Sequence, residues 1–294
     1  MHLAKKLNTD IISADSAQLY RRLNIGTAKP TEAEQKEIQH HLLDLVEPDQ
    51  NFSVADFQRE ANRLINSLWN IKKLPFMAGG TGLYIQAVTD SYSFGNKSAS
   101  HELRSSLLKQ AETENGLNEL YKKLEEVDSA AASKIHYNDK RRIIRALEVY
   151  HMEGVPISRQ EELTRQKEAP YNTMIYVLDM ERSMLYQRIE TRVEVMLEQG
   201  LLNEVQSLYR EGFDLDSPAM QILGYRQMIS FLKNEMSWED TIAEIKKQTR
   251  NLAKRQLTWF RRIKEARWIK TDGNKDDLER IAEIIYNEVK ELRP

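Results

Sequence analysis

Short apolar runs of strand length alternate with longer stretches of helical pattern along this chain. Four of these runs lie at residues 10–15, 42–46, 74–78 and 174–179. Parallel strands need long crossover connections, which helices usually supply, so the alternation favours an α/β protein. We therefore predict a parallel sheet with helices between its strands.

The first long helix is signalled at its start. Ser53 and Asp56 have the spacing of a capping box, in which each side chain accepts a hydrogen bond from a backbone N–H group. Apolar residues then recur on one helix face, at Val54, Phe57, Ala61, Leu64, Ile65 and Leu68. This segment is predicted to be the crossover helix that leads into the strand at residues 74–78.

The strand pattern disappears between about residue 100 and residue 168, where the spacing of apolar residues is helical throughout. We predict a helical insertion at 100–168 that divides the core into a first part, 1–99, and a second part, 169–294. The second part is predicted to contain helices at residues 183–210, 238–262 and 276–292.

The composition excludes several kinds of site. The 294 residues, 40% of them hydrophobic, can bury a substantial core. The chain has no cysteine, so disulfides, thiolate metal sites and cysteine nucleophiles are excluded. The sequence has no stretch of about eighteen apolar residues and no visible export signal, which predicts a cytoplasmic protein outside the membrane.

The charge of the chain is unevenly distributed. The formal net charge is -2, yet the segment from Lys246 to Arg267 holds nine basic residues against one acid, Glu265. That segment alone carries +8, which leaves -10 for the remaining residues. A polyanion such as a nucleic acid could therefore bind locally.

Asp15 and Ser16 follow the first predicted strand. Ligands of open α/β sheets bind beyond the carboxyl ends of the strands, so a carboxylate at this position can be a general base or a metal ligand. Either side chain can equally cap a following helix. The residues alone leave both interpretations open.

A glycine-rich turn, Gly79–Gly82, follows the strand at residues 74–78 and precedes a helical pattern. Glycines permit close backbone approach to a ligand, and free N–H groups at a helix start attract phosphate. The Thr81 hydroxyl would add a further polar contact. An ordinary turn explains the pattern as well.

Three further groups of residues are basic. Arg188 and Arg192 stand four residues apart beside an apolar stripe and could clamp a diphosphate, or could lie on a solvated face and pair with acids. The other two groups could bind nucleic acid, or could lie on helices that bury their apolar residues. They comprise Lys140, Arg141, Arg142 and Arg145, and then Lys254, Arg255, Arg261 and Arg262 with Trp259 and Phe260.

In this order, these features closely resemble the tRNA dimethylallyltransferase family, also called tRNA isopentenylpyrophosphate transferases. The matching segments are IISADSAQLYRRLNIGTAKP, HHLLDLVEP, FSVADFQREA, GGTGLYIQA, IHYNDKRRIIRALE, RIETRV, ILGYRQM and LAKRQLTWFR. The resemblance implies transfer of a dimethylallyl group from dimethylallyl diphosphate to N6 of adenosine 37 in tRNA. It also implies a P-loop-like α/β core, an insertion that grips the anticodon stem-loop, and a target base flipped out of its stack.

The resemblance assigns roles to individual residues. Asp15 matches the general base and Arg192 an arginine implicated in catalysis, while Arg188 is a possible helper. Substrate contacts are implied for Ser16, Ala17, Gln18 and Thr81. Contacts to tRNA are implied for Arg141, Arg142, Arg145, Gln221, Gly224, Tyr225, Arg226, Lys254, Arg255, Gln256, Thr258, Trp259 and Arg261.

Family members begin with an apolar strand and a phosphate-binding loop, G-P-T-x-x-G-K-T, before a helix that ends like the segment Leu3–Asn8. In that loop, a lysine would contact the diphosphate and a threonine would hold Mg²⁺. Neither residue has a counterpart in these 294 residues. We expect an N-terminally shortened monomer with a gap at the sheet's central strand, and we assign no metal ligand in it. An inert tRNA-binding protein and a small-molecule kinase remain alternatives.

Overall fold

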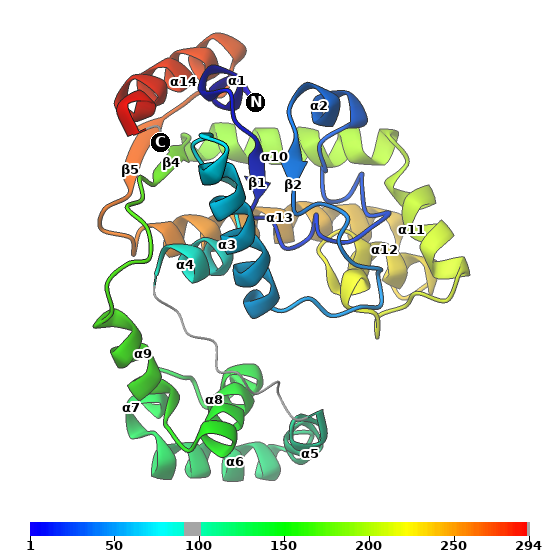
Figure 1. Cartoon of the computed structure of the whole chain (residues 1–294). Coiled ribbons are helices and arrows are strands. Elements are labelled where there is room, and N and C mark those ends of the chain that lie inside the picture. The colour runs from blue at the N-terminus through cyan, green and yellow to red at the C-terminus, as the bar shows by residue number, and fades with distance from the viewer. Residues whose placement is uncertain (91–100, 293–294) are drawn as a thin grey trace. The chain divides into compact units, whose positions relative to one another are not determined.

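The computed structural model describes residues 1–90 and 101–292, and divides the chain into two compact units (Figure 1). One unit comprises Met1–Val88 and Asn172–Pro294, and the other comprises Thr89–Tyr171. The insertion predicted at 100–168 lies within the second unit. Each unit is described by itself below.

The described strands of the first unit form two parallel sheets. β1 (Ile11–Ser13) lies between β2 (His40–His41) and β3 (Phe76–Ala78). β4 (Tyr176–Asp179) pairs with β5 (Arg267–Lys270) in a second sheet. Every described pairing is parallel, as predicted, but the strands form two sheets and not the single sheet that the sequence led us to expect. All three residues of β1 are buried, as expected for a parallel strand with both faces covered.

The strand predicted at residues 42–46 was wrong in its position. Its counterpart, β2, ends at His41, because Leu42 and Asp44 have positive φ angles of 62° and 52° and leave the extended conformation. Val46 keeps one isolated parallel bridge to Tyr20. β5 was not predicted, because its apolar residues are flanked by basic ones that resemble the preceding helix.

The helices of the first unit largely follow the predictions. The capping box is confirmed, since the Asp56 N–H donates to Ser53 Oγ and the Ser53 N–H donates to the Asp56 carboxylate. The stretch predicted at 183–210 is two helices, separated by Gly200 with a φ of 96°. The helices are α1 (His2–Leu7), α2 (Glu32–Glu37), α3 (Val54–Asn70), α4 (Gly82–Thr89), α10 (Arg182–Glu198), α11 (Leu201–Arg210), α12 (Tyr225–Leu232), α13 (Trp238–Phe260) and α14 (Lys275–Val289), with short 3₁₀ helices η1 (Pro218–Gln221) and η2 (Lys290–Leu292).

The half-buried carboxylate of Glu204 forms hydrogen bonds to the irregular segment that follows β1. Glu204 on α11 accepts hydrogen bonds from the backbone N–H groups of Asn24, Ile25 and Gly26 and from the Tyr225 hydroxyl. The ring of Tyr225 is fully buried and packs against Gly26, where an added Cβ would lie 2.5 Å from it. The segment is therefore tied to α11 and α12.

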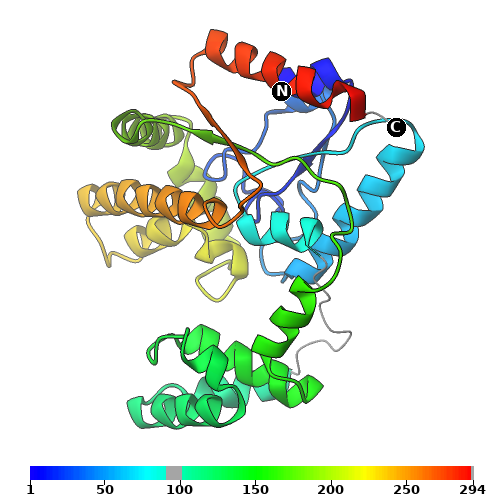
Figure 2. The same cartoon turned by 90° about the vertical axis from the view of Figure 1, so that its left-hand side faces the viewer.

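The second unit contains helices only, among its described residues (Figure 2). It has its own core around Leu120, Leu124 and Ile143. Its buried Glu148 lies 3.6 Å from Arg104 and 3.7 Å from Arg145. The helices are α5 (His101–Gln110), α6 (Glu114–Val127), α7 (Ser129–Ala132), α8 (Lys140–Glu153) and α9 (Ile157–Arg165). Across the described part of the chain, no helix is long and apolar enough to span a bilayer.

We predict that Glu204→Gln lowers the free energy of unfolding by about 2 kcal/mol, because an amide has one acceptor oxygen for several donors and carries no charge. Denaturant unfolding followed by circular dichroism measures the change. Glu198→Gln, an exposed substitution at the end of the neighbouring helix, is the control and should leave the free energy of unfolding unchanged. Equal effects in the two variants would show that Glu204 does not fasten the segment.

Candidate active site

Asp15 lies in the loop that follows β1. No helix begins within the next residues, so the helix-cap interpretation of Asp15 and Ser16 was wrong. Asp15 Oδ1 instead accepts a hydrogen bond of 2.8 Å from the Ala17 N–H, which forms a tight local turn. The carboxylate is partly buried at the carboxyl end of the sheet, where α/β proteins bind ligands.

The loops after β1 and β3 are joined directly. The Ala14 N–H donates to the Ala78 carbonyl at 2.8 Å, and the Thr81 N–H donates to the Ala14 carbonyl at 3.0 Å. The Ser16 N–H then donates to Thr81 Oγ1 at 3.0 Å, and the Thr81 hydroxyl lies 3.2 Å from Ser16 Oγ. Residues 15–16 and Thr81, far apart in sequence, are thus held side by side.

The glycines of the turn make room for protein groups. An added Cβ at Gly79 would overlap the backbone of Ala14, while one at Gly80 would meet only the Gln256 side chain. One at Gly82 would overlap the Trp259 ring. Gln256 and Trp259 both belong to α13, so α13 packs on this turn.

The environment of Asp15 shifts its acidity. Burial raises the pKa of the Asp15 carboxyl, and the N–H groups of Ala17 and Gln18 and the charge of Arg192 only partly oppose this rise. Arg192, an exposed residue of α10, makes the smallest of these three opposing contributions to the pKa of Asp15. A carboxylate with a raised pKa is a stronger base than an exposed one.

Two other predicted substrate residues have internal partners. The Gln18 amide donates to the carbonyls of Thr27 and Ala28, and its oxygen accepts a bond from the Ser13 hydroxyl. Arg188 Nη1 donates to the Asp272 carbonyl at 3.1 Å, beyond the end of β5. Gln18 thus braces the loop after β1, and Arg188 braces the loop after β5.

The family model of the IPP transferases matches residues 18–263 of this chain. The chain belongs to the IPP transferase family. It is 47% identical over 286 residues to the tRNA dimethylallyltransferase of Carboxydothermus hydrogenoformans, with 97% of this chain and 91% of the relative covered. It is 43% identical to the tRNA dimethylallyltransferase of Natranaerobius thermophilus, with 96% of this chain and 85% of the relative covered.

Solved structures of related proteins have the same fold. The full-length tRNA isopentenylpyrophosphate transferase of Bacillus halodurans has a TM-score of 0.71 and 39% identity, covering 98% of this chain and 91% of its own. A eukaryotic dimethylallyltransferase acting on tRNA has a TM-score of 0.83 and 28% identity, covering 100% of this chain and 76% of its own. The predicted P-loop-like α/β fold class is confirmed by these matches.

The residues that the family resemblance assigns to tRNA differ in exposure. Tyr225 and Gly224 are buried, and the Tyr225 side chain is part of the core, which leaves it no surface for an RNA. Gln256 and Trp259 are half-buried where α13 packs on the glycine turn. The exposed members are Arg141, Arg142, Arg145, Gln221, Arg226, Lys254, Arg255, Thr258 and Arg261.

Two residues that hold the site were missed by the sequence analysis. Glu204 stands in an ordinary amphipathic helix pattern and gives no local signal of its four bonds. Lys29 is 3% exposed, and its Nζ donates to the Tyr20 carbonyl at 2.8 Å and to Asp44 Oδ1 at 2.6 Å. A buried lysine is exceptional, and only its place within the family segment could have singled it out.

We predict that Gly79→Ala lowers the free energy of unfolding by about 1–3 kcal/mol, because the new methyl group forces the backbones of two adjoining loops apart. Gly80→Ala is the matched control, since its methyl group displaces only a flexible side chain and should cost less than half as much. Thermal unfolding measures both. If Gly80→Ala destabilises the protein as much as Gly79→Ala does, the close approach of Gly79 to the Ala14 backbone does not explain the loss of stability.

Proposed function

We propose that this protein transfers a dimethylallyl group from dimethylallyl diphosphate to N6 of adenosine 37 in tRNA. The observation that carries the proposal is the partly buried Asp15, with a raised pKa, beside Thr81 and under the charge of Arg192. Relatives named tRNA dimethylallyltransferase support it.

The proposed chemistry needs a base, because the lone pair of the adenine amine is delocalised into the ring and makes the amine a poor nucleophile. Asp15 accepts a proton from N6 as the N–C bond to the allylic carbon forms. The C–O bond to the diphosphate breaks, and its electron pair leaves with the diphosphate oxygen. Arg192 and the Thr81 hydroxyl stabilise the charge that develops on this leaving group.

The neighbouring residues orient the two substrates in this proposal. The exposed Ser16 and the backbone of Ala17 contact the adenosine, next to the carboxylate that deprotonates it. Gln18 and Arg188, whose polar atoms bond to the protein, keep the two loops in place. Positioning of this kind lowers the barrier because the reacting groups lose little freedom in the transition state.

The described residues do not form a magnesium site. Residues 1–90 and 101–292 contain no group of three histidine or acidic side chains able to hold a metal ion. The hydroxyl oxygens of Ser16 and Thr81, which lie in the same loops as Asp15, already bond to each other. The residues thus do not fit a dedicated Mg²⁺ site, and the proposed steps involve none.

The anticodon stem-loop is the proposed RNA partner. The exposed basic side chains of α13, namely Lys254, Arg255 and Arg261, would neutralise its phosphates. They lie on the helix whose Gln256 and Trp259 pack against the turn that carries Thr81. Binding along α13 would therefore bring an RNA loop next to Asp15.

An assay with unmodified anticodon stem-loop RNA, dimethylallyl diphosphate and Mg²⁺ tests the proposal. It is run with this chain and with the phosphate-binding loop of the family pattern joined ahead of Met1, and mass spectrometry detects prenylated RNA. Binding without transfer in both forms would instead support an inert RNA-binding protein. Transfer of phosphate to a small metabolite would support a kinase.

In the form that turns over, we predict that Asp15→Asn lowers the single-turnover rate by roughly a hundredfold to ten-thousandfold, the usual worth of a positioned general base. The amide keeps an acceptor for the Ala17 N–H, so RNA affinity and melting temperature should change little. Asp49→Asn, at an exposed site, is the control and should have the wild-type rate. A near-normal rate in Asp15→Asn would mean that another group is the base.

A further inference from the structure

The second unit contains a buried acid that has no part in the proposed reaction. Glu148 lies in the apolar stretch of α8, between the buried Leu147 and Val149, and it is 1% exposed. Across residues 1–90 and 101–292, its two carboxylate oxygens are the buried side-chain polar atoms that have no hydrogen-bond partner in the protein. Buried polar groups of proteins are almost always hydrogen-bonded, so this carboxylate needs an explanation.

Two arginines supply the charge that opposes Glu148. Arg104 Nη1 on α5 lies 3.6 Å from Glu148 Oε1, and Arg145 Nη1 on α8 lies 3.7 Å from Glu148 Oε2. Both distances are within the range of an ion pair but are too long for a hydrogen bond. The three side chains form a group that we call the Glu148 triad. In it, each oxygen of one buried carboxylate anchors a guanidinium group from a different helix.

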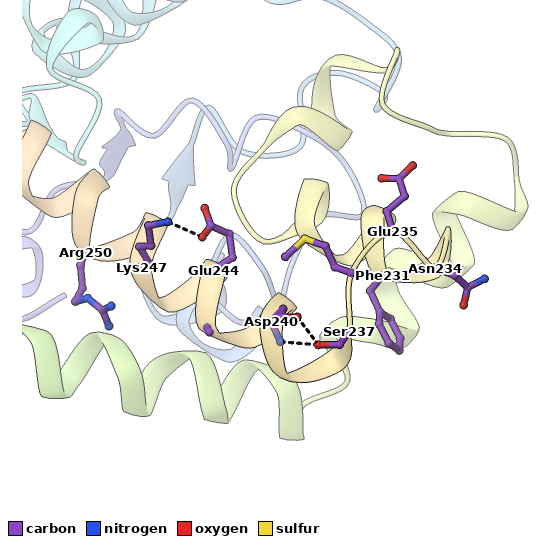
Figure 3. A pocket seen from close by; sticks show the side chains of 10 residues that line it. Phe231, Asn234, Glu235, Ser237, Asp240, Glu244, Lys247 and Arg250 are labelled. Atoms are coloured by element: carbon purple, nitrogen blue, oxygen red, sulfur yellow. Dashed lines mark hydrogen bonds and ion pairs between the residues drawn. The ribbon is translucent and has the colours of Figure 1, made fainter.

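Carboxylates of the first unit are bonded differently, as the hollow lined by α12, α13 and the residues between them shows (Figure 3). There Glu244 accepts a hydrogen bond of 2.9 Å from Lys247, and Asp240 accepts one of 2.8 Å from the Ser237 hydroxyl. Both acids bond to groups within or at the start of their own helix, α13. Glu148 makes no such bond, so it does not brace α8 in this way.

Packing alone does not account for an acid at this position. Removing a carboxylate from water is costly, and ion pairs offset that cost well only when hydrogen bonds accompany them. An apolar residue of similar volume would extend the core that already joins Leu107 of α5 to Ile144 of α8, without this cost. What only an acid adds is a negative charge that keeps two guanidinium groups close together despite their repulsion.

The two guanidinium groups remain open to a ligand. The side chains of Arg104 and Arg145 are 54% and 52% exposed, although one nitrogen of each faces a buried oxygen. An arginine has five N–H donors, so each side chain keeps donors for a partner outside the protein. Two arginines against one carboxylate also leave one positive charge unpaired within the triad. These properties suit an anion with several acceptor oxygens.

The surroundings of the triad favour a polyanion over a small anion. Arg141 is exposed and stands four residues before Arg145, so both lie on the same face of α8. With Arg104, the exposed cations thus extend from α8 to α5. Successive phosphates of a nucleic acid match cations that are spread in this way, whereas a free phosphate would use the triad alone.

We propose that Glu148 is a positioning residue that holds Arg104 and Arg145 together, so that the two arginines contact one phosphate of an RNA backbone. A phosphate fits because each guanidinium fork can donate two parallel hydrogen bonds to its oxygens. The proposal rests on the proposed function, which names RNA as the partner. It goes beyond the family resemblance, which assigns Arg141 and Arg145 to tRNA but gives no role to Arg104 or Glu148.

The test is a double-mutant cycle on RNA binding by the full chain. It comprises Arg104→Gln, Glu148→Gln and the two together, and anticodon stem-loop RNA is titrated across a salt series. The control cycle comprises Arg159→Gln, Glu162→Gln and their double variant. Arg159 and Glu162 form an ion pair in the same unit, and Arg159 is 55% exposed, almost as Arg104 is, but their carboxylate is exposed too. Melting followed by circular dichroism checks the fold of every variant.

We expect Arg104→Gln to weaken RNA binding about fivefold and to lower the slope of log affinity against log salt by about one, because one phosphate contact is lost. Arg159→Gln should change both much less. The double variant Arg104→Gln/Glu148→Gln should bind RNA as Glu148→Gln does, because the second substitution removes nothing further once the triad is broken.

The sign of the Glu148→Gln effect separates positioning from a structural role. Loss of a negative charge by itself makes a protein more attractive to RNA, so the control Glu162→Gln should bind RNA equally or slightly more tightly. Glu148→Gln should instead bind RNA severalfold more weakly, because the two arginines are no longer held together.

Wild-type affinity and salt slope in Arg104→Gln overturn the site, and so does equal or tighter binding by a folded Glu148→Gln. Losses that multiply in the double variant overturn the positioning role of Glu148. If Glu148→Gln does not fold, the exposed substitution Arg104→Gln decides alone, by the affinity and slope given above.

The transfer assay described above separates this proposal from the proposed function. Prenylation of RNA by a protein in which Arg104→Gln binds normally would leave the transferase function standing without the triad. The expected coupling between Arg104 and Glu148, in a protein that binds RNA but transfers no prenyl group, would leave the triad standing without that function. A wild-type chain that binds no RNA overturns both.

Discussion

The pairing of β1 with β3 is the contact on which the candidate active site depends. Past the ends of the strands, two backbone hydrogen bonds continue the connection through Ala14, and they bring Ser16 to the Thr81 hydroxyl. The Ala14 backbone can lie this close to residue 79 only because Gly79 has no side chain. The site is thus assembled by the backbone, so it does not depend on a ligand to bring its groups together.

A second set of contacts holds the long segment after β1, which has little regular secondary structure. Its backbone groups are hydrogen-bonded by Lys29 and Gln18 from within the segment and by Glu204 on α11, and each of these side chains is at least partly buried. This rigidity has a chemical consequence. Asp15 remains in a partly dry environment that raises its pKa, while Arg192 supplies a positive charge nearby. Basicity and charge stabilisation are therefore built into one end of the sheet.

The sequence predicts these features unequally, for physical reasons. Periodicity and capping chemistry are local, so the start of α3, its Ser53–Asp56 box and its apolar face could be predicted from the sequence. Local patterns singled out Asp15, Thr81 and Arg192, and the family resemblance then assigned them roles. Neither gave an account of burial, and Tyr225, which the resemblance assigns to tRNA, is buried in the core. Strand ends depend on distant partners and on unusual backbone angles, as at Leu42. Long-range polar bonds, such as those of Glu204, have no local sequence signal.

The central claim is that Asp15 is the base, and the pH dependence of the single-turnover rate with saturating RNA and diphosphate tests it most directly. The carboxylate must be ionised to accept the proton, so the rate should fall as the pH falls through its pKa. Because burial raises that pKa, the midpoint should lie above the ordinary value of 3.8. The slow residual rate of Asp15→Asn should lack this acid limb. An acid limb that persists unchanged in Asp15→Asn would contradict the account.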